Sequence, residues 1–108
     1  MLSNPDTNTL MRFWVPIKHL GFRTQELVKG KYIGQHNGIH LMTHFNKELC
    51  MHVVSELTTG YGIANAFKEE FAIRKAKRRI DVNKESMDLF IKATNAEYGA
   101  LNGVISTK

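Results

Sequence analysis

The stretch KYIGQHNGIHLMTHF, residues 31–45, decides the fold class. Two runs rich in β-branched, aromatic and apolar residues, 31–36 and 39–45, flank the dipeptide Asn37-Gly38. Asn-Gly favours a two-residue hairpin loop, because a type I′ turn needs positive φ at both central residues. We therefore expect two strands, near 31–36 and 39–45, paired antiparallel across this turn.

The segment before the hairpin predicts one more strand. Apolar side chains alternate with others over residues 11–17, and this period of two is typical of a strand. Pro16 cannot donate a ladder hydrogen bond, so this strand should either lie at a sheet edge or end at this residue. Residues 24–29 predict a single helical turn, with Thr24 as its cap and Gly30 as its stop. Residues 1–9 are polar and predict a frayed lead-in.

The segment after the hairpin continues the meander. Asn46-Lys47 predicts a second turn, and the apolar and β-branched residues of 49–56 predict a strand. Thr58-Thr59-Gly60 predicts a third turn, which leads into a short strand over 61–64.

From Asn65 the period changes to that of a helix. Asn65 is a plausible cap, and residues 66–80 contain no Gly or Pro. Residues 81–83 should break this helix. A second helix should begin near Asn83 or Ser86 and weaken at Gly99 before it ends at Gly103. The chain thus predicts one α+β domain spanning 1–108: an antiparallel meander of three to five strands followed by two helices packed on one face.

Composition excludes several classes of protein. With 108 residues, 43% hydrophobic and 23% charged, the chain has ordinary globular values and no low-complexity character. No apolar run approaches the ~18–20 residues of a membrane span, and no signal peptide is visible. A single cysteine cannot form an internal disulfide, which favours a reducing cytoplasm. We expect a cytoplasmic protein without a membrane contact.

The net charge of +5 is concentrated in one place. Residues 68–79 include six basic and two acidic side chains, whereas the rest of the chain has nine basic and eight acidic residues. A local basic patch suits nucleic-acid phosphates, an anionic membrane face or an acidic protein surface. Alternatively, it is a solvated helix end, where the helix dipole favours cations near the C-terminus. The six are Lys68, Arg74, Lys75, Lys77, Arg78 and Arg79.

This helix has two distinct faces. At 100° per residue, one arc of about 120° collects a small apolar set, which should be the core face. Phe71 points nearly the opposite way, among Arg74, Lys75 and Arg78, where an exposed aromatic ring would suit base stacking or a protein contact. Alternatively, Phe67 and Phe71 pack under another part of the chain. The core set is Ala66, Ala72, Ile73, Ala76 and Ile80.

The histidines and the cysteine do not predict a catalytic or metal site. His36, His40 and His44 recur every fourth residue, but on strands His40 and His44 would lie about 13 Å apart, too far for one ion. Cys50 and His52 would be parallel on one strand face without converging, so we expect a buried thiol and a satisfied histidine. No phosphate loop or paired-carboxylate motif is present, and a metal-independent nuclease built from His, Lys and Tyr has no motif.

One family resemblance exists, over about 40 residues. The meander followed by a helix with a basic tip resembles a double-stranded-RNA-binding domain, from His40 and Phe45 through Gly60-Tyr61-Gly62 to the helix carrying Ala72 and Ala76. That family places phosphate-binding lysines at the start of this helix. Here residues 67–71 read FKEEF, and an opening helix is missing before residue 30. The resemblance therefore does not imply the family's usual RNA contact.

The sequence favours a non-catalytic binding module with no cofactor and no metal. The first hypothesis is nucleic acid, DNA or RNA, bound through the basic helix, with Phe71 as a stacking side chain. The second is an adaptor or inhibitor, of the kind that phages and mobile elements encode as accessory factors, which docks on an acidic protein surface. A homodimer is compatible with either hypothesis.

Overall fold

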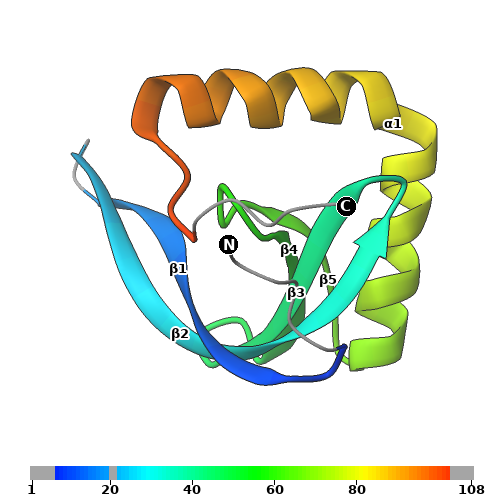
Figure 1. Cartoon of the computed structure of the whole chain (residues 1–108). Helices are drawn as coiled ribbons and strands as arrows, with labels where there is room; N and C mark the ends of the chain where they lie inside the picture. Colours follow the sequence, from blue (N-terminus) through cyan, green and yellow to red (C-terminus); the bar gives the residue numbers. More distant parts are fainter. Residues whose placement is uncertain (1–6, 20–21, 103–108) are drawn as a thin grey trace.

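The computed structural model describes residues 7–19 and 22–102, and it shows a curved antiparallel sheet followed by one long helix (Figure 1). The strands are joined in sequence order, so the sheet is a five-strand meander with β1 and β5 at its edges. The predicted α+β class and meander are confirmed. The elements are β1 (Leu10–His19), β2 (Phe22–His36), β3 (Ile39–Asn46), β4 (Met51–Glu56), β5 (Gly62–Ala66) and α1 (Glu69–Tyr98).

The hairpin at Asn37-Gly38 forms as predicted. His36 pairs with Ile39, and the two turn residues have φ of 51° and 80°, the left-handed values that a type I′ turn requires. The turns at 47–50 and 57–59 are also present, and the predicted edge position of the Pro16 strand is confirmed. Local turn chemistry therefore sets three connections of the meander.

The helical turn predicted at residues 24–29 is wrong, because these residues belong to β2. They pair with β1 from Ile17↔Thr24 to Arg12↔Lys29, and this ladder satisfies more backbone groups than one isolated turn can. At the end of the segment predicted to fray, the Asn8 amide donates to the Tyr32 carbonyl at 2.5 Å, and the Thr9 carbonyl accepts from the Tyr32 amide at 3.1 Å. Residues 1–6 lie outside the described part.

One helix replaces the two that the sequence predicts. Asn65 and Ala66 are not its start, because they pair with β4, and α1 begins at Glu69 after Lys68. Asn83 has non-helical angles (φ −120°, ψ 27°), so the helix changes direction there and continues to Tyr98 (Figure 1). The Asn83 amide donates to the Arg79 carbonyl at 3.1 Å, which keeps the kink hydrogen-bonded. Gly103 lies outside the described residues.

The predicted core face of the helix is confirmed at three positions. Ala72, Ala76 and Ile80 are fully buried against β3, β4 and β5. Ile73 is only half-buried, and Ala66 meets the same cluster from β5 instead of from the helix. The strand residues of this cluster are Ile39, Leu41, Val54 and Ala64.

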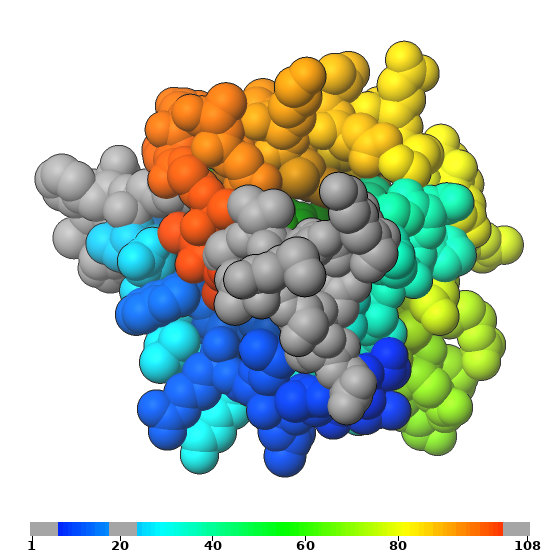
Figure 2. Space-filling model, in the orientation of Figure 1, coloured from blue at the N-terminus to red at the C-terminus, as the bar shows by residue number. Residues whose placement is uncertain are grey.

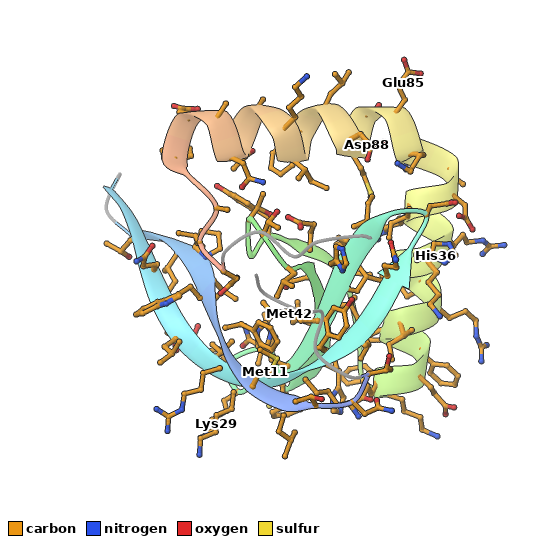
Figure 3. All side chains as sticks on the ribbon, viewed as in Figure 1. Met11, Lys29, His36, Met42, Glu85 and Asp88 are labelled. Carbon is orange, nitrogen blue, oxygen red and sulfur yellow. The ribbon has the colours of Figure 1, made fainter. Side chains whose placement is uncertain are left out.

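A second cluster fills the other face of the sheet. It consists of Phe13, Tyr32, Met42 and Leu57, and Met42 lies inside the curve of the sheet (Figure 3). We call this the inner face and the helix-bearing side the outer face. Because side chains alternate along a strand, the outer face of β1 carries the neighbours of Phe13.

Curvature brings β1 close to the turn between β4 and β5. The Asn102 side chain joins them: its Oδ1 accepts from the Trp14 amide at 2.7 Å, while its Nδ2 donates to the carbonyls of Trp14 and Leu57. Gly60 packs closely against the Trp14 carbonyl, since a Cβ at this position would lie 2.4 Å from the carbonyl oxygen. These contacts hold the edge strand in place. Within the described ranges, no helix is long and apolar enough to cross a bilayer.

Candidate nucleic-acid interface

The basic residues of α1 lie on the side away from the core. All six predicted site cations are exposed, whereas Ala72, Ala76 and Ile80 on the opposite side of the helix are fully buried. Figure 2 shows the two halves of α1 as one continuous surface over the right and upper sides of the molecule. The first half, with its positive charge, is the part beside β5.

Two of the six cations bind the edge of the sheet. Lys75 Nζ donates to the Asn65 carbonyl at 2.8 Å, and Arg79 donates to the Ile63 carbonyl at 2.6 Å. An edge strand leaves backbone groups without a ladder partner, and these cations satisfy two of them on β5. Lys75 and Arg79 therefore attach the helix to the sheet, a role that their sequence positions did not indicate.

The other cations are differently placed. Arg74, Lys77 and Arg78 form no ion pair with any residue of the described chain, and of the two acids nearby, Glu69 pairs with Lys31 at 2.6 Å. The first half of α1 thus presents uncompensated positive charge to solvent.

Phe71 lies between two of these cations. Lys68 Nζ is 5.7 Å and the Arg74 guanidinium carbon 5.4 Å from its ring centroid, within cation–π range. Its side chain is 43% exposed and that of Phe67 is 74% exposed, so neither ring is packed away in this chain. Of the cations expected around Phe71, Arg74 contacts its ring, and Lys68 is the second cation there. The exposure of both rings does not agree with the alternative in which Phe67 and Phe71 are packed away.

The structure adds a second surface that the sequence-based site did not include. The outer face of β1, β2 and β3 carries Trp14, Leu27 and Phe45, which α1 leaves 37%, 41% and 50% exposed. A cleft of about 860 Å³ lies between β1, β2 and the β3–β4 turn, and both faces of the sheet contribute to its lining: Leu27 and Phe45 from the outer face, and Val28 and His44 from the inner face. Part of this surface could be predicted from the sequence, because the alternation over residues 11–17 places Trp14 on the strand face opposite to the apolar residues.

The histidines are separated by the fold. His36 hydrogen-bonds Asp81 at 2.7 Å and lies against α1 (Figure 3), whereas His40 and His44 are buried on the inner face. No group of three metal-ligating side chains occurs among the described residues. Cys50 lies in the turn at φ 53° and is exposed, so the predicted buried thiol is wrong; Asn46 accepts the Leu49 amide there and bends the chain before β4 begins.

Burial shifts the titration of the inner-face groups. Desolvation lowers the pKa of His40, and the nearby Glu56 carboxylate partly opposes this shift. Desolvation also lowers the pKa of His44, where the Glu26 carboxylate has the same opposing effect. Desolvation also raises the pKa of Tyr32, whose hydroxyl lies 2.7 Å from His40 Nδ1.

Glu56 is 4% exposed, and its carboxylate accepts from the backbone amides of Thr58 and Thr59 at 2.7 and 2.8 Å. Both carboxylate oxygens are thus bound by the turn that follows β4, together with the Thr58 hydroxyl. A cavity of about 250 Å³ adjoins Glu56 under the second half of α1. Its carboxylate supports the β4–β5 connection.

Comparison with known proteins gives no match: no protein-family model, no curated protein and no solved structure is similar to this chain. The chain's own surface is therefore the basis for a functional proposal.

Proposed function

We propose that this protein is a non-catalytic module that binds nucleic acid through phosphate contacts made by the first half of α1. One observation carries the proposal: Arg74, Lys77 and Arg78 are exposed and unpaired within the described residues, beside a ring that two cations flank. The negative charge of phosphate groups would balance the positive charge of these three cations. Releasing their counterions is the main source of such affinity.

The structure narrows the set of phosphate-binding candidates. Lys75 and Arg79 donate to β5 carbonyls, so replacing them would loosen the helix as well as remove charge. Arg74 and Arg78 make no hydrogen bond to the described part of the chain. They are one helical turn apart and therefore lie on one side of α1. These two arginines are the cleanest test of phosphate contact.

The experiment compares two double variants of equal charge. Arg74→Gln with Arg78→Gln removes two charges from the proposed site, and Lys84→Gln with Lys92→Gln removes two from the second half of α1. Affinity for a labelled duplex and a labelled single strand is measured between 50 and 200 mM salt by fluorescence anisotropy, a range in which phosphate contacts dominate.

The site variant should weaken binding to all sequences about equally, because phosphate contacts carry no base information. Its slope of log affinity against log salt should flatten by up to about 0.9 per lost contact on B-form DNA. The control should retain the slope of the unmodified protein. Equal slopes for both variants contradict the proposal.

An acidic protein surface is the alternative partner, favoured by the exposure of Phe67 and Phe71. Aromatic side chains dominate many protein interfaces. In that case Phe71→Ala would weaken binding more than any single charge change, and the charge changes would mainly slow association at low salt. Absence of binding to DNA and RNA at 50 mM salt, together with a stoichiometric protein partner, overturns the first proposal in favour of this one.

A further inference from the structure

The outer sheet face combines exposed rings with cations, and strand register brings them together. Arg12 pairs with Lys29, and Trp14 pairs with Leu27, so these four side chains lie on one face of β1 and β2. Figure 3 shows Lys29 pointing away from the molecule on the outer side of the curve. Phe13, between Arg12 and Trp14, is buried on the inner face.

The same face continues across β3 and β4. Gly30 pairs with His44, which places Lys29 beside Phe45 where the β2–β3 ladder ends. Phe45 pairs with His52, and the two rings meet edge to face at 5.2 Å. This contact orients the phenyl ring while half of its surface stays exposed. Both Lys29 and Phe45 line the cleft beside the β3–β4 turn.

The row leads directly to the basic helix. His52 pairs with Ala66 at the end of β5, and Phe67 and Lys68 follow it in the chain. From Arg12 to Ala66 the row crosses four interstrand spacings of about 4.8 Å, or about 19 Å. The aromatic and basic side chains of the sheet and those of α1 thus form one path.

The charge of this path favours an anion. Arg12 and Lys29 have no carboxylate partner among residues 7–19 and 22–102. Two carboxylates line the cleft: Glu26 alternates to the inner face, where it acts on His44, and Glu48 lies in the β3–β4 turn. Cations beside exposed rings are the combination that single strands select, because phosphates meet the charges while unpaired bases stack on the rings.

We propose that the outer sheet face binds single-stranded nucleic acid, with bases stacked on Trp14 and Phe45 and phosphates held by Arg12 and Lys29. This inference rests on the proposed nucleic-acid function and specifies its strand form. A duplex keeps its bases paired inside the helix, so it reaches the charges but not the rings. Single strands therefore gain contacts here that duplexes do not.

Trp14 provides a direct readout, because it is the only tryptophan of the chain. Stacking of a base on its indole should quench its fluorescence. The probes are a twelve-nucleotide oligothymidine and a twelve-base-pair duplex, each labelled for anisotropy. The oligothymidine should bind more tightly than the duplex and quench Trp14 emission, whereas the duplex should leave the emission unchanged.

The variants are Trp14→Leu and Phe45→Leu, which keep an apolar side chain and remove the ring. Each should weaken oligothymidine binding about 5- to 150-fold, as expected for one lost base stack, and leave duplex binding unchanged. Phe90→Leu is the matched control, since Phe90 is 49% exposed on the second half of α1. The hydrogen bonds of Trp14 to Asn102 are made by its backbone, so Trp14→Leu retains them, and Phe45→Leu tests the same face independently if Trp14→Leu does not fold.

Two results overturn the inference and separate it from the proposed function. Equal binding of single strand and duplex, with constant Trp14 emission and no effect of Phe45→Leu, refutes the sheet-face site. If the Arg74 and Arg78 changes still flatten the salt slope, phosphate binding by α1 stands without it. If neither the oligothymidine nor the duplex binds, both the sheet-face site and phosphate binding by α1 are refuted.

Discussion

Replacing Ile80 by Ala tests whether the buried side of α1 holds the helix on the sheet. Ile80 is fully buried in the cluster that includes Leu41 and Val54. The substitution removes three carbons, each contributing about 0.8 kcal/mol through burial, so the transfer term alone is about 2.4 kcal/mol. If the site cannot collapse, the remaining cavity raises the loss toward about 5 kcal/mol.

The assay is equilibrium unfolding in guanidinium chloride, followed by circular dichroism, with Val82→Ala as control. Val82 is on the same helix but 76% exposed, so its loss should stay within about 0.5 kcal/mol. Ile80→Ala should also lower Tm by at least about 10 °C in a domain of this size. A loss below about 1 kcal/mol at Ile80, or equal losses at both positions, would refute the assigned packing of α1.

Two further predictions concern the sheet. Burial lowers the pKa of His40 and His44 below 6.5, so the unfolded state binds more protons once the pH falls below that value. The contribution of these two neutral histidines to the free energy of unfolding should therefore be fully present above about pH 6.5 and decrease on acidification. Urea unfolding midpoints that do not change from pH 7.5 to 5 would contradict this prediction. Gly60→Ala places a Cβ 2.4 Å from the Trp14 carbonyl oxygen at φ +76° and should cost more than Gly38→Ala, where φ is +80° but nothing lies within 4 Å. Gly38→Ala is the control, because it adds only the strain of a left-handed backbone, about 1–2 kcal/mol. Equal losses in the free energy of unfolding for the two variants would mean that β1 does not pack closely against the turn at Gly60.

Much of the sheet was predictable because its signals are local. Asn37-Gly38 specifies its own turn type, and the alternation over 11–17 specifies which side chains share a face. The predicted second helix failed for a different reason. Residues 81–83 have low helix propensity, but the kink at Asn83 is hydrogen-bonded to Arg79, and packing on both sides carries the helix through it.

The candidate site was predictable only in part. The charge cluster and the outward direction of Phe71 follow from composition and helical period, which need no knowledge of distant residues. That Lys75 and Arg79 bind β5 carbonyls depends on how α1 sits against the sheet edge. No pattern within the helix itself distinguishes them from Arg74.

The sequence alone determined the hairpin, the strand alternation, the basic side of the helix and its buried alanines. Tertiary structure alone decided that 24–29 is a strand, because those residues gain their hydrogen bonds from β1. It also decided that Trp14 and Phe45, 31 positions apart, share one exposed surface. Pairing register is a property of several strands at once, so side chains distant in sequence become neighbours only when the whole sheet is assembled.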